Sequence, residues 1–289
     1  MICGWKTCLR LSLFLAVLAT GMPVRAGDFE TIRGVAYVQR DSGELLADVY
    51  IPTGDGPFPA VLAVHGGAWR MGAKWQMTGY AQELAGVGFT VVSINYRLAP
   101  EHKFPAQIED CKSAVRWMRK NASQYKIDPA RIGAVGYSAG GHLVALLGAT
   151  DPACGLEGPN ADSTSTRLQC VVAGGAPCDF RLIPPDSEGL AYWLGGSRAE
   201  KPAAYELASP LAFVSRDDPP ILFFHGDADR LVPLLGPQAM VKKLGEVGVP
   251  AQLYTIVGAG HIPAFADPKA HDETVKFFEE HLKNSAPRP

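Results

Sequence analysis

The sequence predicts an α/β protein whose mostly parallel sheet is covered by helices on both faces. Short apolar runs alternate with stretches of helical spacing over most of the 289 residues. Several of these runs are continuously apolar, which is typical of strands buried on both sides. One run, residues 131–135, leads through a glycine-rich pentapeptide straight into a small-residue helical stretch. This strand–turn–helix order is the basic unit of such folds.

The composition is that of an ordinary globular protein, with 47% hydrophobic and 19% charged residues. A net charge of −2 gives no reason to expect nucleic acid or an acidic surface as a partner. The chain has no internal repeat. We therefore expect a single domain over residues 27–289, with a small insertion at about 176–209.

Residues 1–26 have the pattern of a secretory signal peptide. Lys6 and Arg10 give a basic start, residues 11–19 are apolar, and Val24 and Ala26 are small residues before a cleavage point. The apolar run is short for a membrane span, although a retained anchor is the alternative. We therefore predict a secreted or periplasmic protein with no membrane span once the signal is removed.

The first half of the chain starts with an antiparallel pair. Residues 30–40 and 44–51 alternate apolar and polar side chains around a short turn, which predicts a β-hairpin with one solvated face. Buried strands are expected at 60–64 and 89–94, with a helix at 78–87 between them. Helical spacing then returns in the apolar residues Ile108, Cys111, Val115 and Met118.

The second half continues the alternation. The predicted elements are strands at 131–135, 168–174, 221–224 and 252–257, and helices at 141–149 and 234–247. Asp267 and Pro268 supply a cap and a first-position proline for the final helix. Residues 151–168 are polar and loop-like, and the segment 176–209 shows weak helical signals only.

Chemically capable residues follow the strands of this sheet. They are His65, Gly66, Gly67, Ser138, Asp227, Asp229 and His261. Because ligands of parallel sheets bind beyond the carboxyl ends of the strands, we expect these residues to converge at one edge.

Ser138 is the predicted nucleophile. Gly136-Tyr137-Ser138-Ala139-Gly140 has the pattern of a nucleophile elbow. A serine hydroxyl needs a base, and the base needs an acid that orients it. In this topology the acid and then the histidine follow the serine.

His261, in a loop after the last strand, is the predicted base. Asp229 is the preferred acid. Asp227 is the first alternative, although it could instead be a turn residue that caps backbone amides. Asp179 is the third candidate. The base must be neutral, so activity should fall as the pH drops through about 6–7.

Acyl transfer also needs N–H donors for the developing oxyanion. The amide that follows the nucleophile, that of Ala139, is one candidate. Gly66 and Gly67 are the others, because residues without a Cβ let the backbone approach closely. Ala68 is a near neighbour of this predicted oxyanion hole.

Four motifs together carry a resemblance to a known family. They are residues 65–69 (HGGAW), 96–106 (YRLAPEHKFPA), 136–142 (GYSAGGH) and 229–233 (DRLVP). Over roughly residues 30–284 the chain resembles the α/β-hydrolase superfamily, and within it the hormone-sensitive-lipase-like carboxylesterases and related exported bacterial esterases. The resemblance implies an eight-stranded sheet, ester hydrolysis without a cofactor, and a triad of Ser138, Asp229 and His261.

The expected activity is that of a serine esterase with an acyl-enzyme on Ser138, acting on a short-chain, aryl or polysaccharide-linked (acetyl or feruloyl) ester. Trp69, Tyr137 and Trp193 could line its substrate pocket or belong to the core. An arylformamidase or peptidase-like amide hydrolase is the alternative, and a non-catalytic binding protein of the same fold is a remote one. The sequence gives no metal site and no oligomeric state.

Four cysteines follow the signal peptide: Cys111, Cys154, Cys170 and Cys178. Export to an oxidising compartment permits disulfides. We expect a disulfide between Cys154 and Cys170, which flank a polar segment, with Cys178 as the rival partner. Cys111 is expected to be a buried free thiol.

Overall fold

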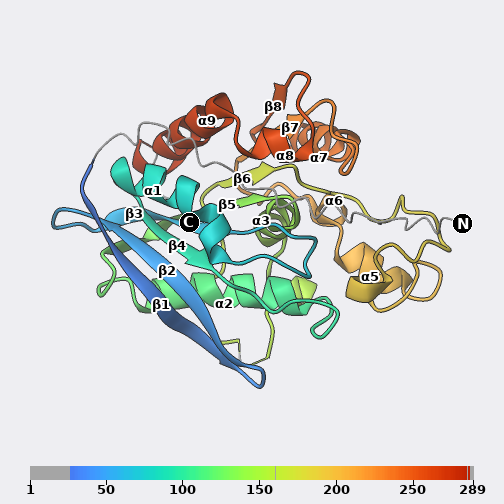
Figure 1. The fold of residues 1–289 in the computed structure, drawn as a ribbon, viewed down its shortest axis with the longest axis horizontal. Helices are drawn as coiled ribbons and strands as arrows, with labels where there is room; N and C mark the ends of the chain where they lie inside the picture. Colours follow the sequence, from blue (N-terminus) through green and yellow to red (C-terminus); the bar gives the residue numbers. More distant parts are fainter. Residues whose placement is uncertain (1–26, 160, 285, 287–289) are drawn as a thin grey trace, which may run out of the picture.

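A single eight-stranded sheet organises the computed structural model, which describes residues 27–159, 161–284 and 286 (Figure 1). The predicted signal peptide lies outside the described residues. The strands, in spatial order, are β1 (Phe29–Arg40), β2 (Gly43–Pro52), β4 (Thr90–Ile94), β3 (Phe58–Val64), β5 (Ile127–Tyr137), β6 (Val171–Gly174), β7 (Ile221–Gly226) and β8 (Ala251–Ile256).

The sheet is antiparallel at one edge and parallel beyond it. β1 pairs antiparallel with β2, and β2 with β4, whereas every later pairing is parallel. The turn of the predicted hairpin closes at Arg40 opposite Gly43. The predicted fold class is therefore confirmed.

Helices connect these strands. The longer ones are α1 (Thr78–Gly86), α2 (Ala106–Lys120), α3 (Ala139–Ala149), α7 (Leu235–Glu246) and α9 (Pro268–Phe278). The shorter ones are α4 (Ala191–Leu194), α5 (Pro202–Leu207), α6 (Pro210–Phe213), α8 (His261–Phe265), the 3₁₀ turns η1 (Lys74–Met77) and η2 (Pro152–Cys154), and the π turn η3 (Glu279–Lys283).

Alternate residues of each central strand contribute to two separate cores. On β3, Leu62 and Val64 pack in the core that holds the apolar faces of α2, α3 and α7. Val61 and Ala63 pack in the other core, with α1 and α9. Because side chains alternate across a strand, burial on both faces requires the continuous apolar runs seen in the sequence.

One expectation about local structure needs correction. The alternation predicted for β2 ends at Ala47, and from there to Pro52 the strand is buried, because its side chains pack into the cores on both faces of the sheet. The segment 176–209 contains the short helices α4 and α5, and α6 follows it before β7. The weak helical signals of this segment therefore correspond to short helices in the structure.

The expected disulfide is absent, because all four cysteines in the described residues are free. Cys170 is buried in the core on the α1 and α9 side of the sheet. Cys154 lies beyond the C-terminal end of α3, where its Sγ is 3.4 Å from Oδ1 of Asp151. The Cys154–Cys170 prediction is wrong because the two thiols face different environments. Cys111 is a buried free thiol as expected.

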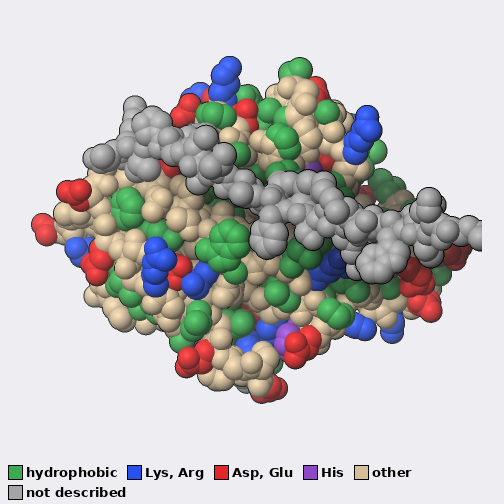
Figure 2. All heavy atoms as spheres, in the orientation of Figure 1, with side chains coloured by type: hydrophobic (Ala, Val, Ile, Leu, Met, Phe, Trp, Pro, Cys, Tyr) green, Lys and Arg blue, Asp and Glu red, His purple; other side chains and the backbone are tan. Residues whose placement is uncertain are grey.

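The surface carries charges of both signs. Figure 2 shows basic and acidic side chains interspersed over one face, in keeping with the small net charge of −2. Among the described residues, every helix falls short of the length and apolar character that a membrane span requires.

Candidate active site

Ser138 occupies a strained turn between β5 and α3. Its φ of +56° lies in the left-handed region that side chains other than glycine rarely adopt. The backbone is held there by hydrogen bonds from the Ser138 N–H to the carbonyl of Gly174 (2.8 Å) and from the His142 N–H to the carbonyl of Ser138 (2.9 Å). The strain is therefore maintained by the sheet and the helix around it.

Close packing around this turn excludes a side chain at Gly140. A Cβ placed there would lie 2.0 Å from the carbonyl oxygen of Val64, at the end of the neighbouring strand. The sequence pattern of small residues around Ser138 thus has a steric cause. It lets α3 start directly against the end of β3.

Ser138, His261 and Asp229 form a continuous hydrogen-bonded chain. Nε2 of His261 is 2.9 Å from Oγ of Ser138, and Nδ1 of His261 is 2.6 Å from Oδ2 of Asp229. Because an ionised carboxylate only accepts hydrogen bonds, Nδ1 carries the imidazole proton and Nε2 accepts from the serine hydroxyl. The ring is therefore in the tautomer that a general base requires.

The Asp229 carboxyl is fully buried, which by itself opposes its ionisation. Hydrogen bonds from the N–H groups of Val232 and Leu231 (both 2.9 Å) and from His261 outweigh burial and hold the Asp229 pKa below its ordinary value. Asp229 therefore stays charged where His261 needs a negative partner.

The structure brings neither alternative acid to His261. The Asp227 carboxylate accepts a hydrogen bond from the N–H of Gly258 (2.6 Å), which fits its interpretation as a turn-capping residue. Asp179 is paired with Arg181 (2.8 Å). His261 itself is the first residue of α8, not part of a loop as expected from the sequence.

The predicted oxyanion residues lie beside Ser138. A Cβ on Gly66 would be 3.3 Å from the Ser138 Cβ, and Gly67 has a φ of +112°. Within the described chain, no backbone hydrogen bond uses the N–H of Gly66, Gly67 or Ala139. These three amides remain available to an oxyanion.

Two aromatic side chains fix the carbonyl groups of this turn. Nδ1 of His65 donates to the carbonyl of Gly66 (2.7 Å), and the ring stacks on Tyr96 with centroids 4.2 Å apart. The Tyr96 hydroxyl donates to the carbonyl of His65 (3.1 Å). Because each carbonyl shares a peptide plane with the next N–H, these contacts fix the Gly66 and Gly67 amides.

The three aromatic residues suggested for the substrate pocket are buried in the structure. Trp69 is 5% exposed and stacks on the fully buried Trp193, with centroids 3.7 Å apart. The Tyr137 hydroxyl donates to the carbonyl of His261, and its side chain is 5% exposed. This packing matches the interpretation of the three residues as part of the core. Trp193 in particular has no exposed surface with which to line a substrate pocket.

Sequence reasoning missed a buried residue beside the acid. His225 lies at the end of β7, where its Nε2 donates to the carbonyl of Val232 (2.9 Å) and is 3.3 Å from Oδ2 of Asp229. Burial lowers the pKa of His225, so the ring is neutral. The sequence feature that could have indicated His225 is its position at the start of residues 225–233, the stretch that contains Asp229.

His142 is a packed helix residue, as its sequence position suggested. Its Nδ1 accepts a hydrogen bond from the indole N–H of Trp69 (3.1 Å), and its Nε2 donates to the carbonyl of Ala208 (2.7 Å). Burial lowers its pKa to about 4, against the opposing effect of the Ala208 carbonyl. Burial likewise lowers the pKa of His65 to about 4.

These two histidines predict a loss of stability in weak acid. The unfolded chain protonates them near pH 6.5 while the folded protein holds them neutral to about pH 4, so stability falls as the pH drops between these values. Each contributes up to about 1.4 kcal/mol per pH unit. Urea unfolding at pH 7, 5.5 and 4.5 measures this. His142→Gln offers one acceptor and one donor but does not titrate, so it should reduce the slope; an unchanged slope would contradict the prediction.

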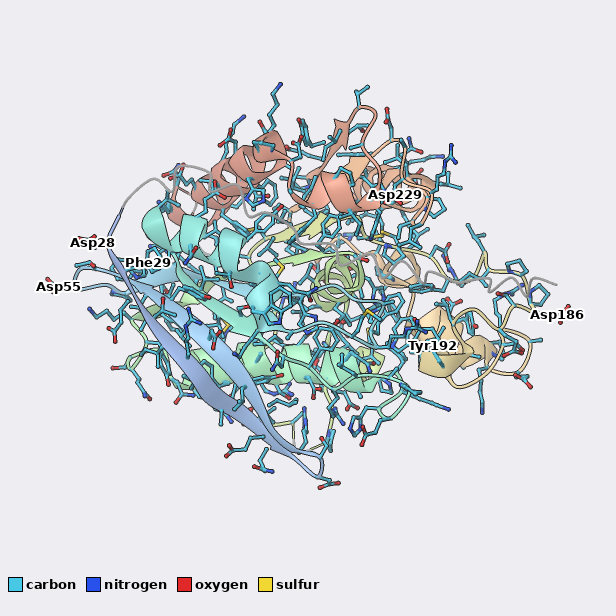
Figure 3. All side chains as sticks on the ribbon, in the orientation of Figure 1. Asp28, Phe29, Asp55, Asp186, Tyr192 and Asp229 are labelled. Carbon is cyan, nitrogen blue, oxygen red and sulfur yellow. The ribbon has the colours of Figure 1, made fainter. Side chains whose placement is uncertain are left out.

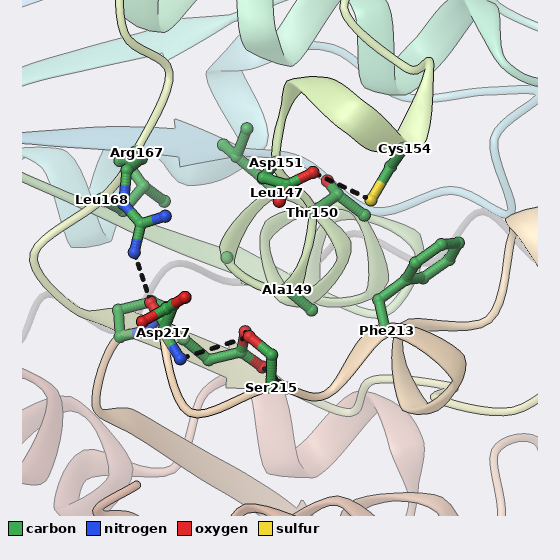
Figure 4. A pocket seen from close by; sticks show the side chains of 13 residues that line it. Leu147, Ala149, Thr150, Asp151, Cys154, Arg167, Leu168, Phe213, Ser215 and Asp217 are labelled. Carbon is green, nitrogen blue, oxygen red and sulfur yellow. Dashed lines mark hydrogen bonds between the residues drawn. The ribbon is translucent and has the colours of Figure 1, made fainter.

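A separate cavity of about 80 Å³ lies at the C-terminal end of α3 (Figure 4). Asp151, Cys154, Arg167 and Phe213 are among its lining residues, and the Arg167 guanidinium donates to the carbonyl of Asp217 (2.6 Å). None of its lining residues belongs to the candidate site. It is also far smaller than the several hundred Å³ typical of ligand pockets.

The BD-FAE family model matches residues 47–244 of this chain. The chain belongs to the BD-FAE family. The match contains the Ser138 turn, the Gly66–Gly67 turn and Asp229, and the predicted resemblance to α/β-hydrolase esterases is confirmed.

The family assignment agrees with curated relatives. Esterase LipC of Mycobacterium tuberculosis is 34% identical over 214 residues, which are 71% of this chain and 53% of that protein. Esterase LipQ of the same species is 32% identical over 70% of this chain and 49% of that protein. The chain thus spans about half the length of these relatives.

Solved structures extend the likeness to about nine tenths of this chain. A truncated carbohydrate esterase from gut microbiota has a TM-score of 0.80 at 31% identity, covering 88% of this chain and 96% of that one. Thermogutta terrifontis esterase 2, in a form phosphonylated by sarin, has a TM-score of 0.74 at 25% identity, covering 90% of this chain and 95% of that one.

Proposed function

We propose that this BD-FAE family protein is a serine carboxylic-ester hydrolase that works through an acyl-enzyme on Ser138. The observation that carries the proposal is the chain of contacts from Ser138 Oγ to His261 Nε2 (2.9 Å) and from His261 Nδ1 to Asp229 (2.6 Å). The esterase names of its relatives and the phosphonylated form of the Thermogutta terrifontis esterase support it.

In the acylation half-reaction, Ser138 Oγ attacks the ester carbonyl carbon while His261 Nε2 takes the hydroxyl proton. The carbonyl electron pair moves to oxygen, and the N–H groups of Gly66, Gly67 and Ala139 stabilise the resulting oxyanion. Collapse of the tetrahedral intermediate breaks the bond to the alcohol oxygen. His261 returns its proton to that oxygen, so a neutral alcohol leaves.

Deacylation repeats these steps with water. His261 removes a proton from the attacking water, a second tetrahedral intermediate forms, and its collapse releases the carboxylic acid and restores the Ser138 hydroxyl. Asp229 remains ionised throughout and stabilises the imidazolium that exists in each half-reaction. The low Asp229 pKa and its backbone hydrogen bonds suit this fixed role.

For the substrate we propose a short-chain, aryl or polysaccharide-linked acetyl or feruloyl ester. One structural relative is described as a carbohydrate esterase, which favours the polysaccharide-linked class. The signal-peptide pattern of residues 1–26 supports action outside the cytoplasm, where such polymers are met. Exposed apolar side chains next to the site, Leu231 and Ile262, suit an apolar acyl or aryl group.

A fluorophosphonate probe tests the mechanism. Wild-type protein should form one adduct on Ser138, identified by mass spectrometry, and Ser138→Ala should neither react nor hydrolyse 4-nitrophenyl acetate. Folded wild-type protein that does not react would favour the non-catalytic alternative. Comparing acetyl, butyryl and feruloyl esters with N-formylkynurenine and a peptide anilide then assigns the substrate, and faster cleavage of either amide would contradict the ester proposal.

A further inference from the structure

The helix α4 contacts the loop that follows Gly67 at three consecutive residues. The Tyr192 hydroxyl donates to the carbonyl of Ala68 (2.8 Å), and the Arg70 guanidinium lies 5.1 Å from the centre of the Tyr192 ring. Trp193 stacks flat on Trp69, at an interplanar angle of 1°. Two adjacent side chains of one helical turn thus contact residues 68, 69 and 70.

The contacted loop has a conformation that it would not adopt by itself. Ala68 and Trp69 have φ values of +51° and +58°, directly after Gly67 at +112°. A left-handed residue other than glycine is strained and persists only where its surroundings fix it. The Ala68 carbonyl is fixed by Tyr192, and the Trp69 carbonyl accepts the N–H of Ala99 (2.9 Å).

The helix α4 is itself anchored to the main body of the domain. The Trp193 indole N–H donates to Oε1 of Gln107 at the start of α2 (3.0 Å), and the Trp193 carbonyl accepts the N–H of Phe104 (2.9 Å). Gln107 in turn donates to the carbonyl of His102 (2.6 Å). These contacts hold α4, and with it Tyr192, in place, although the segment 176–209 has only weak helical signals in the sequence.

We propose that Tyr192 is a positioning residue for the oxyanion hole, acting through the Ala68 carbonyl. The inference rests on the proposed function of Ser138 and adds to it. Tyr192 holds the Ala68–Trp69 peptide plane and so stabilises the left-handed conformation that directly follows Gly67, whose N–H is one of the proposed oxyanion donors. In the view of Figure 3, Tyr192 and Asp229 both lie in the right-hand half of the molecule, on separate segments.

The proposed role of Tyr192 differs from that of His65 and Tyr96, because the three residues bind different carbonyl groups. The other two residues hold the two peptide planes before Gly67, whereas Tyr192 holds the one after Ala68. A peptide flip at 68–69 would change ψ of Ala68 and φ of Trp69, two dihedrals of the left-handed pair itself. Removing the hydroxyl should therefore weaken transition-state binding more than substrate binding.

Tyr192→Phe tests the proposal, since it removes one hydroxyl from a partly exposed ring. The matched control is Tyr205→Phe, whose hydroxyl donates to the carbonyl of Gly196 (3.3 Å) in the same segment but away from the oxyanion loop. For 4-nitrophenyl acetate, Tyr192→Phe should lower kcat about two- to tenfold, the range of one hydrogen bond, with KM nearly unchanged. Affinity for an aryl trifluoromethyl ketone, which forms an oxyanion with the serine, should fall by the same factor.

Tyr205→Phe should leave kcat and ketone affinity unchanged, and both variants should remain folded at the assay temperature. Wild-type kcat and ketone affinity in Tyr192→Phe, or equal losses in the two variants, would overturn the proposal for Tyr192. Hydrolysis that survives in Ser138→Ala would instead overturn the proposed function. The two failures are therefore distinguishable in one set of assays.

Discussion

Replacing Asp229 by asparagine should lower kcat for 4-nitrophenyl acetate by about 10⁴-fold while the protein remains folded. The amide oxygen of asparagine can still accept the N–H groups of Leu231 and Val232, which bind Oδ1 of the native carboxylate. The amide NH₂ would then replace Oδ2, which is 2.6 Å from Nδ1 of His261. Because an NH₂ group donates, it favours the tautomer with Nδ1 unprotonated, and Nε2 then carries a proton and cannot act as a base.

Asp227→Asn is the matched control for this experiment. Asp227 is two residues away, and an asparagine oxygen there can still accept the N–H of Gly258. Its kcat should stay close to that of the wild type. Loss of activity in Asp227→Asn together with its retention in Asp229→Asn would show that the acid has been wrongly assigned.

Gly140→Ala should destabilise the protein strongly, because the backbone around the Ser138 turn leaves no room for an added methyl group. The added Cβ would lie 2.0 Å from the carbonyl oxygen of Val64 and 2.6 Å from that of His65. Both atoms belong to backbone at the end of β3, a strand paired on both sides, so neither can move away without disturbing the sheet. We expect a loss of about 3 kcal/mol or more in the free energy of unfolding, together with lower activity.

Gly245→Ala, in α7, is the corresponding control. No atom lies within 4 Å of a Cβ at that position, and alanine has the higher helix propensity, so the change should stabilise the protein by about 0.4–1 kcal/mol. Urea denaturation of both variants measures the difference. Equal stability of Gly140→Ala and the wild type would mean that the turn at Ser138 is less tightly packed than the structure shows.

Much of the fold was predictable because its signals are local. Strands buried on both faces require continuous apolar runs, and the run at 60–64 coincides with β3 to within two residues. The final helix begins at Pro268, where the Asp267 side chain accepts the N–H of Ala270 (2.8 Å), as the cap residue and proline predicted. Segment 176–209 showed only weak helical signals, because its short helices depend on tertiary contacts such as those of Trp193.

The sequence by itself determined which residues could meet at the candidate site. Parallel strands end at one edge of the sheet, so Ser138, Asp229 and His261, each placed just after a strand, were expected to be neighbours before any distance was known. Strand periodicity, turn glycines and the order of the three residues are all properties of the chain itself.

The tertiary structure alone decided how the side chains are paired. It placed Asp229, and neither Asp227 nor Asp179, against His261, and it buried Trp69 and Trp193 against each other. It kept Cys154 and Cys170 apart. These outcomes depend on contacts between segments distant in sequence, such as Tyr192 with Ala68, and local patterns contain no information about which distant surfaces will meet.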